Sequence, residues 1–491
     1  MGSAASLGVR ETVRDLSLIL AAGAVLSSAT IGRDAPRLSH EGRHAEIARE
    51  MSEMRTWAAP KLLGVPYHEK PPLYYWLAGA SFRLTGGANT ASARLVSVVL
   101  SLGALAAVYF FGRALIGRTG GLAAACILAS TIPWVRDSGA SRTDMTAAAF
   151  NTLAAALLWL ALRPGAGVWT RWGGGAMGGL AMALAVLGKG PVGPAILIAG
   201  FTVYFLTARK DSSPHPAAIL AALIGFIAPL SLWALAVRWA GEEAYLIGLI
   251  FGEGIPKAWD KYPEPPYYYL GVFPARFLPF TLLLPFSIAD SMRAWRDPDP
   301  AIRRGSRIPF IFMVTGLLVL SCIRSKRDQY LLPVYPFAAL HLAFFASRWI
   351  GASTRSDRSG AASAVRERRA AWLLVLWFAG FAIARVGGFW VTDRGEKVLL
   401  DHIRTQVPAD ARAVAYGTDA EPFAFAWPTV PLHAGTPEEV RKAIGEGVDY
   451  VILPPDFIAN LPADLRAGLS LEASQGESPR YHLIQLWRVR R

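Results

Sequence analysis

The chain has 491 residues, of which 53% are hydrophobic and only 18% are charged. Soluble proteins contain roughly 25% charged residues, so this composition excludes an ordinary soluble domain and indicates a membrane protein. The formal net charge is +14. Much of it comes from arginines in short loops, so it does not indicate a nucleic-acid partner. The cysteines Cys126 and Cys322 fall within or at the ends of apolar runs, and give no disulfide framework.

Apolar runs long enough to cross a bilayer recur along the first four-fifths of the chain. A span needs about 17–25 residues for roughly 30 Å of hydrocarbon. The first run is interpreted as an anchor, although the small residues Ser27, Ser28 and Ala29 also suit a signal-peptide cleavage site. The sequence predicts a mainly α, polytopic membrane protein of about eleven transmembrane helices. These begin near Asp15, Ala93, Gly120, Asp144, Gly175, Pro191, Pro216, Tyr268, Arg307, Gln329 and Ala370.

Arginine and lysine lie mainly in alternate loops, most densely at residues 291–307 and 351–369. By the positive-inside rule, these loops face the cytoplasm. The opposite, periplasmic side then receives the first outer loop at residues 33–92 and the tail after Asp393. It also receives the shorter loops at 136–144, 189–190, 239–267 and 323–329.

The tail differs in pattern from the rest of the chain. We expect a transmembrane domain at residues 1–392 and a small periplasmic α/β domain at residues 393–491, which is long enough for one compact core. Short β-rich runs occupy 413–416 and 450–453, and a helix signal begins at Thr436. No catalytic motif stands out in this tail.

The first outer loop holds two expected interfacial helices. In HEGRHAEIAREMSEM, at residues 40–54, Ile47 and Met51 share an apolar face, and the charges are expected to form a solvated face. A second helix begins in PPLYYW, at residues 71–76. Its aromatic side chains are expected to form an interfacial belt.

Ionisable residues of the outer side supply candidates for chemistry. Glu69 and Lys70 precede a helix N-terminus, which favours an anion, although an exposed Glu–Lys pair worth about 0–1 kcal/mol is the alternative. Asp144 stands at the membrane entry of a span, where carboxylates are costly and usually functional. Lys189 stands in the reversal LGKGPVGP, which is not a phosphate-binding P-loop. A snorkelling lysine is the alternative there.

Further cations lie on the expected periplasmic side, where the positive-inside rule predicts few lysines and arginines. Arg324 and Lys326 belong to the turn IRSKRDQYLLP, and Lys257 to the middle loop. An anionic ligand explains them, and anionic lipid headgroups are the alternative. Lysine and arginine neutralise a departing phosphate, while a carboxylate takes the proton of an acceptor hydroxyl. With no nucleotide motif in the chain, a lipid-linked phosphosugar is the donor that fits a membrane site.

Five motifs occur in a familiar order: HEGRHAEIAREM, GVPYHEKPPLYYW, RTDM, LGKG and SKRDQYLLPVYP. Over roughly residues 10–350 the chain resembles the bacterial C-type glycosyltransferases that use polyprenyl-phosphate sugars. These include lipid A aminoarabinose transferases and relatives of the protein O-mannosyltransferases. The resemblance implies an enzyme of the bacterial cytoplasmic (inner) membrane with its active site facing the periplasm. It would transfer a hexose or pentose from undecaprenyl phosphate to lipid A, a protein or another glycan.

The resemblance also assigns roles to residues. It implies that Lys70 and Tyr330 contact the carrier phosphate and that Lys189 is the lysine of the family's KGP reversal. Glu69 and Asp144 match the acidic positions of the motifs. Together with the outer-side charges, this gives two candidate sets. The candidate catalytic residues are Asp144, Glu41 and Glu69, and the candidate phosphate contacts are Lys70, Lys189, Lys257, Lys326, Tyr330 and Arg324.

The chain departs from the family pattern at two places. The first-loop motif begins His40-Glu41 instead of Asp-Glu, so the base is Asp144, Glu41 or His40, with Asp144 slightly favoured. In the middle loop Glu253 is followed by glycine where relatives carry a metal-binding histidine. The cofactor therefore stays open, with Glu69, His68 and His40 as candidate ligands of a divalent metal.

Two other classes of function stay open. A polysaccharide ligase or polymerase uses the same donor chemistry. A non-catalytic lipid transporter has a similar composition, but transporters show inverted repeats and ionisable groups near the bilayer midplane. Here the ionisable groups gather at one surface, which favours the transferase.

Overall fold

The fold was taken from a computed structural model. It describes residues 2–28, 31, 41–208, 214–254, 256, 262–355, 380, 399, 402–403, 405–408, 410–418, 421–425, 427, 431–474 and 484–490. The expected span near Ala370 and the expected domain boundary at Asp393 lie outside these residues.

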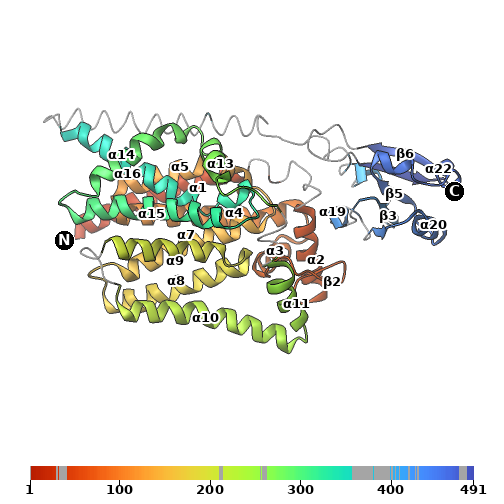
Figure 1. Ribbon diagram of the computed structural model, residues 1–491, viewed down its shortest axis with the longest axis horizontal. Coiled ribbons are helices and arrows are strands. Elements are labelled where there is room, and N and C mark those ends of the chain that lie inside the picture. The colour runs from red at the N-terminus through yellow and green to blue at the C-terminus, as the bar shows by residue number, and fades with distance from the viewer. Residues whose placement is uncertain are drawn as a thin grey trace.

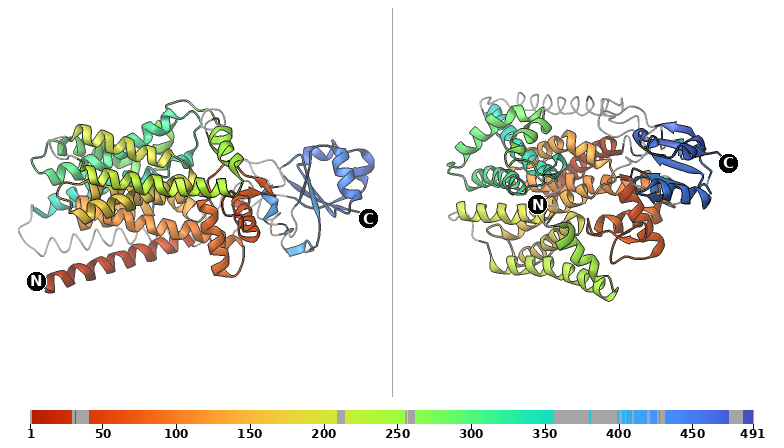
Figure 2. Two further views of the ribbon diagram at one scale, coloured as in Figure 1. Left: turned by 90° about the horizontal axis from the view of Figure 1, so that it is seen from below. Right: turned by 45° about the vertical axis from the view of Figure 1, so that its right-hand side comes forward.

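Long helices lie side by side along the long axis of the molecule and alternate in direction (Figures 1 and 2). Their apolar side chains form one large core that includes Tyr109, Trp159 and Phe312. The helices are α1 Gly2–Ser28, α4 Thr90–Ile116, α5 Arg118–Ala129, α7 Thr143–Leu162, α8 Val168–Lys189, α9 Val192–Thr207, α10 Pro216–Trp239, α14 Leu284–Ala294, α15 Pro300–Cys322 and α16 Tyr335–Arg355.

Four described helices, α4, α7, α10 and α15, are long and apolar enough to cross a membrane, and a pair bent by 108° makes up to five. That pair joins α13 Tyr268–Arg276 to the segment Phe280–Ala294, which begins with the 3-10 turn η3 Phe280–Leu283. The sequence predicts about eleven spans. Part of the difference is that α5 and α9 are shorter than 18 residues.

One end of the bundle is covered by short elements, some of which are labelled at the right of the helices in Figure 1. This end, called the loop end below, contains the outer loops of the expected topology. The strands β1 and β2 pair there as a small antiparallel hairpin. The elements are α2 Arg43–Met54, β1 Lys61–Leu62, β2 Val65–Pro66, α3 Leu73–Thr85, α6 Ile132–Ser138, α11 Glu243–Ile247, η2 Gly248–Gly254 and η4 Asp328–Leu331.

The two helices of the first outer loop are buried more deeply than the sequence predicts. Glu46 and Glu50 of α2, expected on a solvated face, are 0% and 7% exposed. Arg49 holds Glu46, and Glu50 accepts the backbone amides of Leu63 and Gly64 at 2.6 and 3.2 Å. Glu46 and Glu50 are therefore buried and hydrogen-bonded, whereas Glu53 of the same helix stays exposed.

The aromatic residues that open α3 also differ from the expected interfacial belt. Tyr74 and Tyr75 are both 0% exposed. The Tyr74 hydroxyl lies 2.6 Å from Ser141 Oγ, and the Tyr75 hydroxyl lies 3.0 Å from His44 Nδ1. These side chains hold α2, α3 and the start of α7 together, so they belong to the protein interior.

The helices α8 and α10 pack through glycines. A Cβ atom added at Gly179 would lie 2.0 Å from the Ala222 carbonyl oxygen, and one at Gly225 would lie 2.1 Å from the Ala176 carbonyl oxygen. Small residues at such positions let two helix backbones approach closely within a membrane. The opposite face of α10 is exposed, since only 11% of its apolar window is buried.

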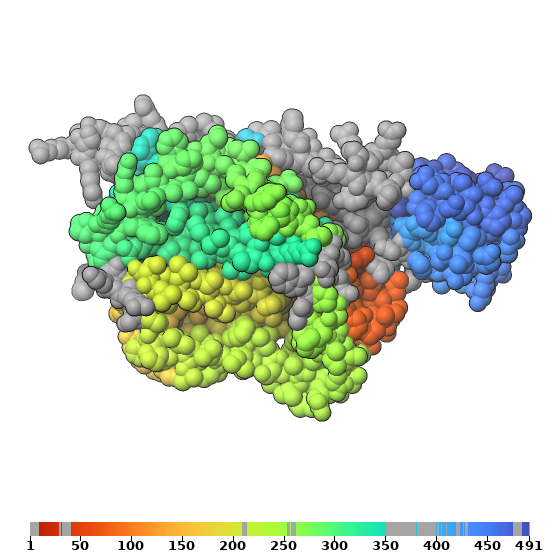
Figure 3. Space-filling view, in the orientation of Figure 1, coloured from red at the N-terminus to blue at the C-terminus, as the bar shows by residue number. Residues whose placement is uncertain are grey.

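The C-terminal part forms a mixed five-stranded sheet in the order β4-β3-β5-β7-β6. The sequence prediction matches β3 and β5, which pair in parallel. Figures 1 and 3 show this sheet beyond the loop end, and Phe425 stacks on Phe82 of α3 with ring centroids 6.4 Å apart. The elements are β3 Ala413–Tyr416, α19 Glu421–Ala424, β4 Leu432–Ala434, α20 Pro437–Gly445, β5 Tyr450–Leu453, α21 Pro455–Ile458, α22 Ala463–Ala467, β6 Leu469–Ser474 and β7 Gln485–Val489.

Candidate active site at the loop end

Four of the predicted site residues meet at the loop end of the bundle. The ammonium of Lys189 is ion-paired with the carboxylate of Asp144 and lies 4.4 Å from the centroid of the Tyr330 ring. Lys70 acts electrostatically on the same carboxylate, as does Arg142. A single buried carboxylate therefore faces three cations that come from different elements.

Helix ends position these groups. Asp144 is the second residue of α7, where the helix dipole favours a negative charge. Lys189 is the last residue of α8, and Gly190 follows with φ of 111°, a conformation that glycine adopts readily. This glycine allows α9 to start at Val192, so the Lys189 side chain stays at the reversal between two buried helices.

The loop that carries Lys70 is fixed by a tyrosine from the middle of the chain. The Tyr245 hydroxyl donates to the Lys70 carbonyl oxygen at 2.8 Å. The Tyr245 ring stacks on His68 with centroids 5.9 Å apart. Burial raises the pKa of Tyr245 well above its ordinary value, so the phenol stays a hydrogen-bond donor over the whole working pH range.

A second ionic cluster anchors the turn that carries Tyr330. Asp328 accepts a hydrogen bond from Arg136 at 3.1 Å and lies 2.9 Å from Arg276. Burial of the Asp328 carboxylate acts to raise its pKa, but Arg136 and Arg276 outweigh burial and hold that pKa below its usual value. Arg136 also binds Asp137, which is 1% exposed. The cluster thus joins α6, α13 and η4.

The sequence prediction did not assign Asp328 and Arg276 a role. The one available signal was the acid itself, since Asp328 follows three cations in the run RSKRD at residues 324–328. Its partner Arg136 is 192 positions away along the chain. Nothing in the local pattern identifies such a partner.

Lys326, a predicted phosphate contact, is 3% exposed. Its ammonium donates to the carbonyl oxygens of Glu264 and Arg324 at 3.0 and 3.4 Å. These bonds, with the backbone pairing of residues 262–264 and 324–326, hold the middle loop against the turn. The side chain of Arg324 is on the exposed surface of this turn. Direct contact of either residue with a phosphate stays a prediction.

Glu41, a candidate base, lies inside the protein. Its carboxylate is 2.8 Å from Arg94 Nη2, and the two side chains are 2% and 5% exposed. The Ser141 amide donates to the same carboxylate at 2.8 Å. Glu41 therefore joins α4 to the loop before α7. Its competitor His40 lies outside the described residues.

Glu69 accepts a hydrogen bond from the Tyr67 hydroxyl at 3.1 Å, and burial raises the pKa of that hydroxyl well above its ordinary value. His68 Nδ1 faces the Tyr245 carbonyl oxygen at 3.3 Å. In the described part of the chain, no three His, Cys, Asp or Glu side chains form a group suited to a metal. The predicted phosphate contact Lys257 and the side chain of Glu253 lie outside the described residues.

Two family models match the chain. Residues 69–251 match the dolichyl-phosphate-mannose-protein mannosyltransferases, and residues 263–408 match the Alg9-like mannosyltransferase family. The first match begins at Glu69 and covers Lys70, Asp144 and Lys189. The second covers Tyr330.

The chain is also similar in sequence to proteins named as arabinosyl transferases. An undecaprenyl phosphate-alpha-4-amino-4-deoxy-L-arabinose arabinosyl transferase of Pectobacterium carotovorum is 32% identical over 355 residues, covering 67% of this chain and 56% of the relative. A protein of the same name from an Enterobacter species is 26% identical, covering 70% of this chain and 62% of the relative. The chain thus spans 56% and 62% of the length of these two relatives.

Among solved structures, ArnT from Cupriavidus metallidurans matches with a TM-score of 0.73 at 18% identity, covering 99% of this chain and 98% of ArnT. An ArnT structure bound to undecaprenyl phosphate matches with a TM-score of 0.71 at 18% identity, covering 96% of this chain and 97% of ArnT. An archaeal oligosaccharyltransferase from Archaeoglobus fulgidus matches with a TM-score of 0.57 at 12% identity, covering 91% and 69%. The chain thus has the fold of ArnT and is similar in sequence to arabinosyl transferases named for an undecaprenyl phosphate donor, in agreement with the resemblance that its motifs indicate.

Proposed function

We propose that this protein transfers a sugar from an undecaprenyl-phosphate carrier to a lipid acceptor at the outer face of the bacterial inner membrane. The sugar class we favour is a 4-amino-4-deoxy-L-arabinose, and the acceptor is lipid A. Both are drawn from the names of its sequence relatives. The observation that carries the proposal is the buried Asp144 carboxylate beside Lys189, Lys70 and Arg142.

The charges of this site suit the departure of a lipid phosphate. Lys189 and Lys70 come from separate elements, so a phosphate placed near Asp144 would meet cations from two sides. The Tyr330 ring, 4.4 Å from Lys189, fixes that ammonium by a cation–π contact. Preorganised cations that meet a developing phosphate charge lower the barrier without a reorganisation cost.

The transfer step follows from this arrangement. The bond between sugar C1 and the carrier phosphate oxygen breaks, and its electron pair stays on the phosphate. The acceptor oxygen forms the new bond to C1, and its proton passes to the Asp144 carboxylate. Undecaprenyl phosphate leaves, with its added negative charge held by Lys189 and Lys70. Asp144 therefore serves as base, and Glu69 orients the loop of Lys70.

The wider topology is part of the proposal. We infer about eleven transmembrane helices, with residues 1–392 as the transmembrane domain and the loop end in the periplasm. Residues 393–491 would form a periplasmic α/β domain. The stacking of Phe425 on Phe82 supports this placement, because it puts the C-terminal sheet at the same end as the first outer loop.

Transfer by purified protein tests the proposal. The full chain in detergent is given undecaprenyl-phosphate aminoarabinose and lipid A, and the products are resolved by mass spectrometry. We expect lipid A to gain one aminoarabinose. The Lys70→Ala protein should lose roughly 10²–10³ in rate, as is typical when a contact to a developing oxyanion is removed.

The matched control is Lys442→Ala, an exposed lysine of the C-terminal sheet region with a 77% exposed side chain. It should transfer at the wild-type rate. Transfer of the sugar to a polypeptide or glycan instead of lipid A would show that lipid A is not the acceptor. Unchanged turnover in Lys70→Ala would reject the site.

A further inference from the structure

Arg142 stands at the start of α7, two positions before Asp144, and the proposed transfer step gives it no role. It is the N-cap residue of the helix, in an extended backbone conformation with φ of −144° and ψ of 146°. Its side chain is 11% exposed, and its charge acts on the Asp144 carboxylate. The Arg142 guanidinium therefore belongs to the candidate active site.

The hydrogen-bond donors of Arg142 are open. An arginine carries five N–H donors, and buried donors nearly always find an acceptor. Among the described residues, Arg142 donates no hydrogen bond, and its Nε atom is buried without an acceptor. Its ionic partner, Asp137 Oδ1, lies 3.8 Å from Nη1, which is longer than a hydrogen bond. A buried charge in this state is costly, so a ligand with acceptor oxygens would be stabilised beside it.

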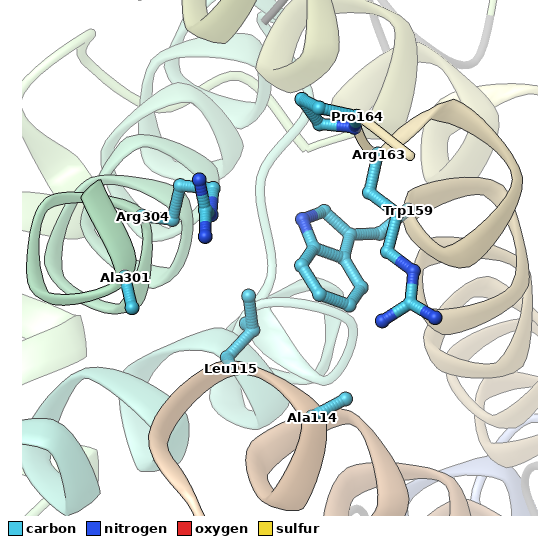
Figure 4. A pocket seen from close by; sticks show the side chains of 7 residues that line it. All are labelled: Ala114, Leu115, Trp159, Arg163, Pro164, Ala301 and Arg304. Atoms are coloured by element: carbon cyan, nitrogen blue, oxygen red, sulfur yellow. The ribbon is translucent and has the colours of Figure 1, made fainter. Parts of the chain in front are cut away.

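Two arginines elsewhere in the bundle differ from Arg142. Arg94, with a 5% exposed side chain, donates to the Glu41 carboxylate at 2.8 Å. Arg163, which follows the last residue of α7, lies over the Trp159 ring at 5.6 Å beside a cavity of about 160 Å³ (Figure 4). Arg163 is exposed, so water satisfies its donors. Of the two arginines that flank α7, the one beside Asp144 is thus the one with a buried, unused donor.

The charges around Arg142 favour an anion. Asp137 is 1% exposed, and both of its carboxylate oxygens already accept from Arg136 at 2.9 Å. Arg136 is in turn shared with Asp328, which Arg276 also contacts. Arg136, Arg142 and Arg276 thus face two aspartates, so one positive charge is not balanced within this cluster.

We propose that Arg142 is a further phosphate-binding residue, whose planar guanidinium donates two hydrogen bonds to the phosphate of the lipid carrier. This inference rests on the proposed function and adds to it, because Lys70 and Lys189 supply point charges but no paired donors. An arginine matches two oxygens of one phosphate in a fixed plane. When the bond to sugar C1 breaks, the phosphate gains negative charge, and the unbalanced cation stabilises it. Asp137 orients the guanidinium before the carrier arrives.

Binding of the carrier alone to the detergent-purified full chain tests the inference. Native mass spectrometry would follow titration with undecaprenyl phosphate and, separately, with undecaprenol, which lacks the phosphate. Arg142→Gln should weaken binding of undecaprenyl phosphate roughly 10–100-fold, the effect of losing a hydrogen bond between charged groups, and leave undecaprenol binding unchanged. Arg142→Lys keeps the charge but not the planar pair of donors, so its affinity should fall between those of wild type and Arg142→Gln.

The matched control is Arg83→Gln, which removes an exposed cation of α3 that lies over the Trp57 ring at 4.9 Å. It should bind undecaprenyl phosphate as wild type does, and an equal loss there would reduce the effect to surface charge. The Tm of Arg142→Gln without ligand should not fall, because Arg142 has no hydrogen bond to lose; a lower Tm with unchanged affinity would make its role structural.

The remaining outcomes separate this inference from the proposed function. A wild-type protein that binds undecaprenol as tightly as undecaprenyl phosphate would contradict both. A wild-type preference for the phosphate that persists in Arg142→Gln would overturn this inference alone. Unchanged carrier affinity in Arg142→Gln, together with weaker binding of lipid A, would also overturn it and place Arg142 at the acceptor.

Discussion

Lys189, the last residue of α8, is ion-paired with Asp144 in the first turn of α7. Removing one member of this pair would leave the other inside the protein without its counterion. Such uncompensated charges are costly. The Lys189 ammonium must therefore interact both with Asp144 and with any phosphate that enters the site. A proton accepted by Asp144 during transfer would release Lys189 toward the departing phosphate, which couples the two halves of the proposed step.

This pair gives the first prediction. Asp144→Asn should lower kcat by roughly 10²–10⁴, the range for a general base, while Lys189→Ala should lower kcat and also raise the KM for the donor. The measurement is sugar transfer at equal amounts of folded protein, judged by gel filtration. An Asp144→Asn protein that retains wild-type kcat would exclude Asp144 as the base.

The buried pair of Glu41 and Arg94 gives the second prediction. Glu41→Gln should destabilise the protein by about 3–5 kcal/mol, because it leaves the Arg94 guanidinium buried without its counterion. The double variant Glu41→Gln/Arg94→Met should recover part of this loss, since paired residues are not additive. The measurement is the midpoint of thermal unfolding in detergent.

The same variants separate the three candidate bases. A fully stable Glu41→Gln protein with no turnover would make Glu41 a catalytic residue instead of a support. A base at His40 would give an activity limb near about pH 6–7 that disappears in His40→Ala. We expect the rate to persist below that range, as a carboxylate base allows.

The third prediction concerns pH and the Asp328 cluster. The folded-state pKa of Asp328 lies below the ordinary value of about 3.9. Its ion pairs therefore stabilise the folded state fully above that value, and the contribution is lost as pH falls through the folded pKa. Asp328→Asn should lower the Tm at pH 7 by removing hydrogen bonds to charged partners, worth roughly 1–3 kcal/mol. The difference from wild type should narrow below about pH 4.

The control for this comparison is Asp464→Asn. Asp464 pairs with Arg441 on the surface, where the two side chains are 60% and 53% exposed. Solvent screening makes such pairs weak, so its Tm should match wild type at every pH. A Tm for Asp328→Asn that equals wild type at pH 7 would show that the cluster does not hold the turn.

The fourth prediction concerns topology. In a background with Cys126 and Cys322 replaced by serine, cysteines at Gly87 and Ser474 should react with an impermeant thiol reagent added to intact cells. Gly87 suits the test because a Cβ atom there meets nothing within 4 Å. A cysteine at Arg296, exposed in the loop 291–307 at the other end, should react only after lysis. Labelling of Gly87→Cys only after lysis would reverse the orientation.

The sequence placed Asp144, Lys189, Lys70 and Tyr330 on one expected membrane side, because each residue stands near the end of an expected span or helix. Alternation of spans was enough to bring them to the same surface. It did not predict the burial of Glu46 or Tyr74. An amphipathic pattern shows which face of a helix is apolar, but not whether a later loop covers the other face.

The difference between the roughly eleven expected spans and the four or five apolar helices of the described residues has a related cause. Glycines make up much of the start of α8, which lowers its hydropathy although it packs inside the bundle. The ion pair of Asp328 with Arg136 could not be predicted from the sequence, because ion pairs between residues far apart in the chain leave no periodic pattern in it.

The glycine seam between α8 and α10 sets limits on how the protein can change over evolutionary time. At Gly179 and Gly225 even alanine would drive a methyl group into a facing carbonyl oxygen. The exposed side of α10 has no such limit, and any lipid-soluble residue serves there. The exposed face of α10 therefore tolerates substitution, whereas the face against α8 does not. The residues of the exposed face can change during evolution while the glycines that contact α8 are retained.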